Sequence, residues 1–133
     1  MTDPTIAALA RVPLFSGLSK RDLAAIAPHA SERDVAAGTE ITRQGDPGDE
    51  FFVVAEGEVQ ISIDGHEVRR LGPGDYLGEI ALVFGGTRTA TATAAEASRL
   101  YVIGRADFDA MVKRHPRIED KILTSVSERM RYR

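Results

Sequence analysis

The sequence predicts a mainly β protein, a sandwich or jelly-roll barrel with helices at both ends of the chain. The central residues, 31–104, consist of short apolar runs separated by glycine-rich turns. Several of these runs alternate apolar and polar residues, which is the pattern of a strand with one buried face. Before and after this region the apolar residues recur at helical spacing. Many short strands joined by tight turns are typical of a barrel or a sandwich.

We expect eight strands in the central region. Their ranges are residues 33–35, 40–42, 51–55, 58–63, 66–71, 75–76, 90–94 and 100–103. The fourth range is the clearest, because Val59, Ile61 and Ile63 alternate with polar residues. Asp64 and Gly65 lie between the fourth and fifth ranges, and this dipeptide favours a two-residue hairpin turn. These two strands should therefore pair directly.

Residues 1–30 are expected to form a helical segment. Thr2 or Asp3 can cap a first short helix. Residues 19–22 fit a capping box, so a second helix should begin there and stop at Pro28.

Residues 105–133 are expected to form two further helices. The first covers residues 105–115 and places three apolar side chains on one face, namely Phe108, Met111 and Val112. The last helix begins at Pro116, and its apolar stripe runs through Ile118, Ile122, Val126 and Met130. Both helices are suited to packing on the barrel.

Composition limits the classes of function. A chain of 133 residues is long enough for one domain with a core and too short for two ordinary ones, so we expect a single domain over residues 1–133. A net charge of −3 provides no basic field for nucleic acid, and the absence of cysteine excludes thiolate chemistry. No stretch approaches the roughly 20 apolar residues of a membrane span, and the N-terminus lacks a secretory pattern. A cytoplasmic protein is therefore expected.

Residues 78–91, GEIALVFGGTRTAT, combine groups that suit a phosphorylated sugar. We expect a short helical turn over residues 78–81, and a helix N-terminus favours an anion. Arg88 adds a planar, permanently charged fork that suits a phosphate. Glu79 repels a phosphate but can accept hydrogen bonds from sugar hydroxyls. The stretch therefore predicts a site for a ribose that carries a phosphate.

The same stretch resembles the phosphate-binding cassette of cyclic nucleotide-binding domains, whose pattern is F-G-E-[LI]-A-L, a short loop, then P-R-x-A-T. The matching residues are Gly78, Glu79, Ile80, Ala81, Leu82, Arg88, Ala90 and Thr91. Leu77 replaces the usual aromatic residue, and Thr87 replaces the proline before the arginine; neither change removes a polar contact. Glycine spacing in GTEITRQGDPGDEFFVVAEGEV and LGPGDYLGE extends the resemblance over most of the chain. The chain is similar to regulatory domains of bacterial cyclic-nucleotide-gated channels and cyclic-nucleotide-dependent kinases.

The resemblance implies an eight-stranded β-roll that binds cAMP or cGMP as its ligand. Glu79 would take the ribose 2′-hydroxyl, and Arg88 with the amides after Gly78 would take the cyclic phosphate. Thr89 could hydrogen-bond the phosphate or the base edge, and a threonine at this place permits cGMP without excluding cAMP. Arg129, in the last helix, would stack on the base. The full set of expected ligand-binding residues is Gly78, Glu79, Ile80, Ala81, Arg88, Thr89, Ala90 and Arg129.

The resemblance also implies moving parts around the roll. Residues 1–30 would be the N-terminal helical segment, residues 31–104 the roll and residues 105–133 the hinge and lid helices. Ligand binding would move the lid helix. An effector domain or a partner protein outside this chain would receive the signal.

Two alternatives belong to other classes. A jelly-roll barrel can be a cupin-like, metal-dependent enzyme, but His29, His66 and His115 lack metal-ligand spacing, so we expect no metal site. No nucleophile and base motif is visible, so we do not expect an enzyme. The other alternative is a ligand-free β-roll that serves as an interaction module. It would need a damaged cassette, and this cassette is intact.

Overall fold

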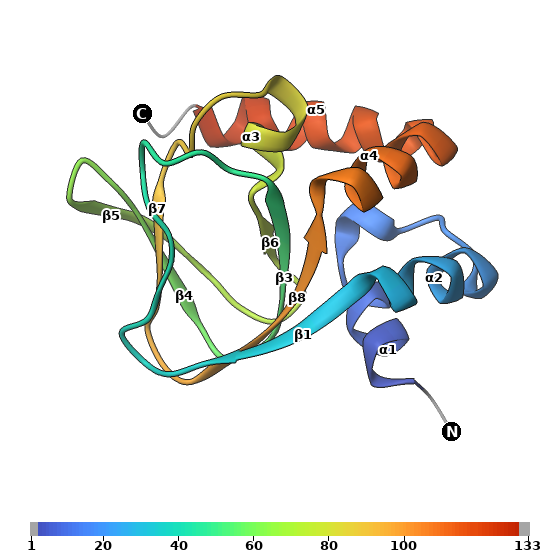
Figure 1. Ribbon diagram of the computed structural model, residues 1–133, viewed down its shortest axis with the longest axis horizontal. Helices are drawn as coiled ribbons and strands as arrows, with labels where there is room; N and C mark the ends of the chain where they lie inside the picture. The colour runs from blue at the N-terminus through green and yellow to red at the C-terminus, as the bar shows by residue number, and fades with distance from the viewer. Residues whose placement is uncertain (1–2, 131–133) are drawn as a thin grey trace.

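The computed structural model describes residues 3–130, without the side chains of residues 80, 83, 84 and 125–130. Eight strands form two four-stranded antiparallel sheets, which face each other as a β-roll (Figure 1). The strands are β1 (Ala30–Val35), β2 (Glu40–Thr42), β3 (Glu50–Glu56), β4 (Val59–Ile63), β5 (His66–Leu71), β6 (Tyr76–Leu77), β7 (Thr91–Ala94) and β8 (Ser98–Gly104). One sheet has the order β1-β8-β3-β6 and the other the order β2-β7-β4-β5. The predicted eight-stranded, mainly β fold is confirmed.

The hairpin between β4 and β5 has the predicted turn. Ile63 pairs with His66, so only Asp64 and Gly65 form the turn. Their φ values of 53° and 82° both lie in the left-handed region that a type I′ hairpin turn requires.

β1 begins three residues earlier than predicted. It pairs with β8 from Ala30 opposite Ile103 to Val35 opposite Ser98. The four residues from Ser31 to Asp34 are all exposed, so the start of this strand carries no alternation of apolar and polar residues. Pairing along the sheet, which the sequence pattern does not reveal, determines where the strand begins.

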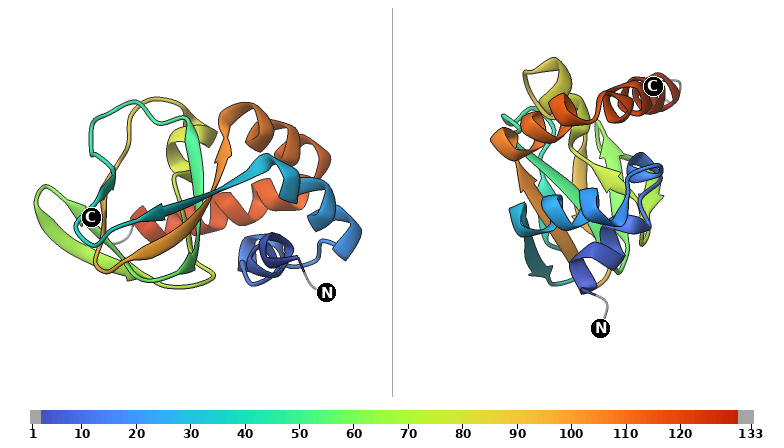
Figure 2. Two further views of the ribbon diagram at one scale, coloured as in Figure 1. Left: turned by 60° about the horizontal axis from the view of Figure 1, so that its bottom comes forward. Right: turned by 90° about the vertical axis from the view of Figure 1, so that its right-hand side faces the viewer.

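Helices lie at one side and at one end of the roll (Figure 1; Figure 2, right). The helical elements are α1 (Pro4–Ala10), η1 (Pro13–Phe15), α2 (Lys20–Ile26), η2 (Ala27–His29), α3 (Glu79–Phe84), α4 (Arg105–Arg114) and α5 (Pro116–Met130). The predicted N-terminal caps are present. Asp3 accepts a hydrogen bond from Thr5 N, and Ser19 and Asp22 form the reciprocal bonds of a capping box, each 3.1 Å long.

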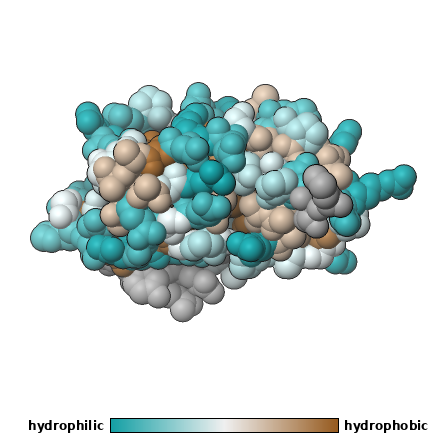
Figure 3. Space-filling model, turned by 90° about the horizontal axis from the view of Figure 1, so that it is seen from below, coloured by the Kyte–Doolittle hydropathy of each residue, from teal (hydrophilic) through white to brown (hydrophobic). Residues whose placement is uncertain are grey.

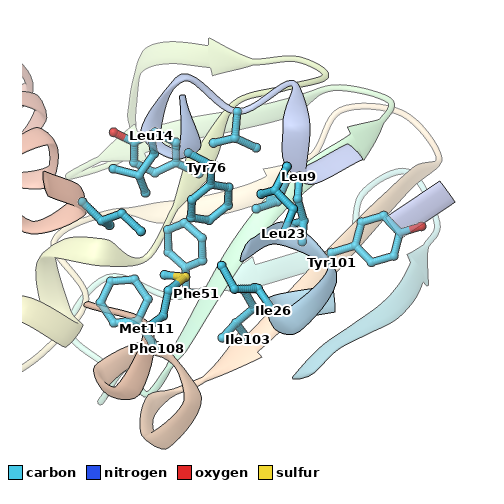
Figure 4. Packing of buried hydrophobic residues seen from close by; sticks show 14 of the residues in the cluster. Leu9, Leu14, Leu23, Ile26, Phe51, Tyr76, Tyr101, Ile103, Phe108 and Met111 are labelled. Carbon is cyan, nitrogen blue, oxygen red and sulfur yellow. The ribbon is translucent and has the colours of Figure 1, made fainter. Parts of the chain in front are cut away.

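β3 separates two hydrophobic cores, because its successive side chains point to opposite faces. Phe51 and Val53 belong to the core between the first sheet and the helices (Figure 4). In this core the Phe51 ring lies 5.1 Å from the ring of Phe108 in α4 and 5.7 Å from that of Tyr76. The second core contains Phe52, Val54, Val59, Ile61, Leu71, Leu77, Ala92, Leu100 and Val102, which come from both sheets. The middle of β3, from Phe51 to Val54, is therefore buried on both faces.

α5 is anchored to the N-terminal segment. Ile118 and Ile122 are buried in the helical core, as the apolar stripe predicted, whereas the side chains of Val126 and Met130 lie outside the described residues. Lys121 Nζ donates to the Ser16 hydroxyl at 2.6 Å and also to the Ser16 carbonyl. The face of the molecule seen in Figure 3 is mostly hydrophilic, with hydrophobic patches between the polar residues.

Candidate functional site

The site is built around the first turn of α3. Gly78 directly precedes this helix, and its φ of 97° is a conformation that a residue with a side chain rarely adopts. The chain can therefore turn sharply from β6 into α3. The first N–H groups of a helix have no partner inside the helix and carry partial positive charge, so this turn can bind an anion. The helical turn predicted at residues 78–81 is present, and the helix continues to Phe84.

Arg88 reaches back to the same turn. Its Nη1 donates to the Gly78 carbonyl at 3.3 Å, and its Nη2 donates to the Glu50 carbonyl at 2.9 Å. The guanidinium lies over the Phe52 ring, 5.7 Å from its centroid, and only 8% of the residue is exposed. The two ends of the predicted 78–91 stretch therefore meet in space.

The charge of Arg88 is held among neutral hydrogen-bond acceptors. Both described hydrogen bonds of its guanidinium end on backbone carbonyls. Burial lowers the pKa of Arg88, and the carboxylates of Glu50, Asp49 and Glu79 partly offset this effect. A buried guanidinium of this kind gains from an anionic partner, because charge-assisted hydrogen bonds are stronger than bonds to neutral groups.

The residues around Arg88 are fixed by the loop that follows β2. Arg88 N donates to the Asp46 carbonyl at 2.7 Å, and Gly45 N donates to the Arg88 carbonyl at 2.9 Å. Gln44 N donates to the Thr91 hydroxyl at 3.0 Å. Gln44 also contacts the β4–β5 turn. Its side-chain nitrogen donates to the Asp64 carboxylate, and its side-chain oxygen accepts from the Asp64 backbone N–H. The backbone of Arg88 is therefore held by hydrogen bonds to the loop that follows β2.

Glu79, the first residue of α3, is fully buried. A carboxylate removed from water is costly unless hydrogen bonds or charges compensate it. At this position it can accept hydrogen bonds from hydroxyl groups next to an anion that binds at the helix N-terminus.

A cavity of about 380 Å³ opens beside Arg88, which is within the size range of small-molecule sites. Its lining residues are Glu40, Ile41, Thr42, Arg43, Asp46, Pro47, Asp49, Glu50, Phe52 and Arg88. Glu79 does not line this cavity. The cavity therefore reaches the arginine from the side of the β2–β3 loop and covers only part of a site that would include α3.

The other sequence-predicted residues are placed as follows. Ala81 is buried, and Thr89 and Ala90 are half-buried on the segment that follows Arg88. Thr42 in β2 donates to the Ala90 carbonyl at 3.3 Å, which fixes the position of that residue. The side chains of Ile80 and Arg129 lie outside the described residues, although both residues belong to helices.

Sequence reasoning did not single out two residues that shape this site. Gly48 is buried against Arg88, and a Cβ atom there would lie 2.6 Å from Arg88 Cζ. Arg105, at the start of α4, donates to the Gly48 carbonyl at 3.0 Å and to the Leu82 carbonyl at 3.5 Å. The glycine spacing around residue 48 was a signal for the first of these. No local signal marked the second, because its partners are backbone atoms distant in sequence.

Two further findings concern the described part of the chain. Among the described side chains of residues 3–130, no group of three or more histidine, aspartate or glutamate residues is suited to hold a metal ion. No helix in this range is both long and apolar enough to cross a membrane.

Comparison with known proteins identifies the family. The sequence model of the cyclic nucleotide-binding domain matches residues 32–115. A putative potassium channel protein of Rhodopseudomonas palustris is 38% identical over 117 residues, which are 86% of this chain and 28% of that protein. A cyclic nucleotide-gated potassium channel of Rhizobium etli is 36% identical over 121 residues, which are 91% of this chain and 34% of that protein. The chain spans about a third of the length of these curated relatives.

A solved structure supports the same assignment. The regulatory domain of Toxoplasma gondii PKA, crystallised with cAMP, superposes with a TM-score of 0.74 at 34% identity, over 84% of this chain and 46% of that chain. The family is one of regulatory, ligand-binding domains. The cupin-like alternative therefore has no support from the relatives. The chain belongs to the cyclic nucleotide-binding domain family.

Proposed function

We propose that the cyclic phosphate binds between Arg88 and the backbone amides after Gly78, and that Glu79 accepts a hydrogen bond from the ribose 2′-hydroxyl. One observation carries this proposal. The guanidinium of Arg88 is buried beside the first turn of α3, and its described hydrogen bonds go to two neutral carbonyls. An anion placed there would gain both the charge of Arg88 and the partial charge of the helix N-terminus.

The remaining cassette residues complete the proposed pocket. Ile80, Ala81 and Ala90 would line it, and the hydroxyl of Thr89 would bond the phosphate or the base edge. We propose cAMP as the working ligand, with cGMP as a second ligand that Thr89 permits. The relative from Toxoplasma gondii was crystallised with cAMP, which supports this choice.

Ligand binding would shift the population of α5 positions. A ligand can do this only when it binds one arrangement better than the other. Arg129 would provide that difference by stacking on the base, because a guanidinium plane can lie on an aromatic ring. α5 lies at the same end of the roll as α3, which supports this role (Figure 1; Figure 2, right).

The domain would act as a sensor and not as an enzyme. We propose that residues 1–133 work as one domain in the cytoplasm and pass their signal to an effector domain or partner protein. Two relatives are named as potassium channels, which makes a channel one candidate effector.

Equilibrium binding of cAMP and cGMP, measured by calorimetry, tests the proposal. Arg88→Ala would leave a buried phosphate without its cation, which costs about 3–5 kcal/mol. The dissociation constant should therefore rise by roughly two to four decades. Arg33→Ala is the matched control. Arg33 also lies near the Phe52 ring, 5.9 Å from its centroid, but it is exposed and paired with Glu50.

The control should bind within about threefold of wild type, since exposed ion pairs contribute little. Folded Arg88→Ala that binds as tightly as wild type would contradict the assignment of the phosphate site.

A further inference from the structure

Arg105 joins three parts of the molecule that are separate in the sequence. It is the first residue of α4, directly after β8. Its Nη2 donates to the Gly48 carbonyl at 3.0 Å, 57 residues away, and its Nη1 reaches the Leu82 carbonyl at 3.5 Å, 23 residues away. One guanidinium thus bridges the loop before β3, the cassette helix α3 and the start of the hinge helix α4.

Both carbonyls belong to segments that form walls of the proposed phosphate site, namely the loop before β3 and the helix α3. Gly48 is packed so closely against the Arg88 guanidinium that no side chain fits between them. Leu82 lies in the last turn of α3, and the first turn of this helix carries Glu79 and meets Arg88 through Gly78. A shift of either wall would therefore move Arg88 or the α3 amides.

The chemistry of the contact favours a fixed geometry. The last carbonyls of a helix have no partner inside the helix and attract a cation. A guanidinium offers several donors in one rigid plane, so it can hold two carbonyls at a set separation, whereas an ammonium group cannot reproduce this fork. The positive charge of Arg105 also opposes that of Arg88 and contributes to its lowered pKa, and an anion bound beside Arg88 would relieve this repulsion.

We propose that Arg105 is a positioning residue for the phosphate site: it holds the Gly48 loop and the end of α3 together so that Arg88 and the α3 amides point at one phosphate. Arg105 acts through these backbone groups and not by touching the ligand. This role rests on the proposed function of Arg88. Because Arg105 begins α4, the same contact ties the occupied site to the hinge helix.

Calorimetric titration with cAMP tests this role in Arg105→Ala and Arg105→Lys. A hydrogen bond to a charged group is worth enough to change affinity by roughly tenfold or more. Arg105→Ala should weaken binding by about that factor, and Arg105→Lys should fall between it and wild type. Arg114→Ala is the matched control, because Arg114 is an exposed arginine at the other end of the same helix. It should bind within about threefold of wild type.

A double-mutant cycle with Arg88→Lys separates positioning from general support of the fold. If Arg105 acts through Arg88, the loss caused by Arg105→Ala should shrink to less than about threefold in the Arg88→Lys background. An equal loss in both backgrounds would overturn the proposal. The thermal unfolding curve of Arg105→Ala without ligand will show whether this variant folds. If it does not fold, the same cycle is measured with Arg105→Lys.

The two proposals can fail separately. Wild-type binding of cAMP together with unchanged affinity in Arg105→Ala would overturn the role of Arg105 alone. Failure of the wild-type chain to bind any cyclic nucleotide would overturn the proposed function of Arg88 and this role with it.

Discussion

The buried carboxylate of Glu79 provides a direct test of how the sugar is held. If it accepts a hydrogen bond from the 2′-hydroxyl, 2′-deoxy-cAMP should bind more weakly than cAMP. A hydrogen bond to a charged group contributes about 1.5–3 kcal/mol, so the expected factor is roughly tenfold or more. Competition binding measures the ratio of the two affinities. Glu79→Gln should reduce the difference in affinity between cAMP and 2′-deoxy-cAMP, because a neutral amide is a weaker hydrogen-bond acceptor than a carboxylate. Equal binding of both nucleotides by wild type would exclude this role.

Gly48 provides a second test at the scale of one residue. Gly48→Ala places a Cβ atom 2.6 Å from Arg88 Cζ, so the guanidinium must move. Overpacking of this kind costs about 1–3 kcal/mol, and the loss should appear in affinity for cAMP, because the displaced guanidinium is the proposed partner of the phosphate. Gly72→Ala is the control, since a Cβ there meets nothing within 4 Å. Calorimetry should show weaker binding only in Gly48→Ala; an unchanged dissociation constant would argue against the need for this close contact.

Sequence reasoning singled out the two charged groups of the candidate site but not the backbone groups that support them. Glu79 and Arg88 stand in one short stretch, and the chemistry of a carboxylate and a guanidinium is visible without a structure. The supports of Arg88 are the carbonyls of Gly78 and Glu50, and every residue carries such a group. Arg105 was missed for the same reason. Contacts to backbone atoms leave no trace in residue type.

Among the elements, α2 provides a prediction about pH. The Ser19 backbone N–H and then the Ser19 side chain lower the pKa of Asp22. A carboxylate whose pKa is lower in the folded state stabilises the fold above its unfolded pKa of about 3.9, and this contribution is lost as the pH falls through the lowered folded value. Ser19→Ala should therefore move the pKa of Asp22 back towards its ordinary value.

An NMR titration of the Asp22 carboxyl group measures this shift. Ser31→Ala, a change at an exposed serine of β1, should leave the titration of Asp22 as it is in wild type. A titration curve of Asp22 that is the same in Ser19→Ala and wild type would show that the backbone N–H alone maintains the lowered pKa.

The elements differ in how well their sequence predicts them. β4 and β5 were clear, because one alternates apolar and polar residues and a two-residue turn joins them. No element was predicted for residues 13–15, yet Leu14 and Phe15 of η1 are buried in the helical core. A three-residue helix is too short to show a period, so its packing depends on contacts that only the folded chain provides.

For the whole molecule, the last helix provides the test of the lid. Truncation after Ser127 removes Arg129 but keeps Ile118 and Ile122, the buried residues that anchor α5. A cation stacked on a ring at a partly exposed site contributes about 0.5–2 kcal/mol, so affinity should fall roughly three- to thirtyfold without being abolished. Calorimetry measures this change.

Hydrogen exchange provides the second measurement on the same variant. Nucleotide should protect the amides of α5 in the full chain, and this protection should disappear in the truncated chain. Unchanged affinity on truncation, together with no protection of α5 in the full chain, would place the lid elsewhere.

The pairing of β1 with β8 has a consequence for folding while the chain is being synthesised on the ribosome. Ala30 lies opposite Ile103, so β1 leaves the ribosome long before its partner exists. At the usual rate of synthesis the delay is roughly 4–15 seconds. During this time β1 is a solitary strand that could pair with other chains. Its exposed Glu32, Arg33 and Asp34 are the kind of charged residues that discourage such pairing. The charged residues of β1 would thus protect the nascent chain from aggregation.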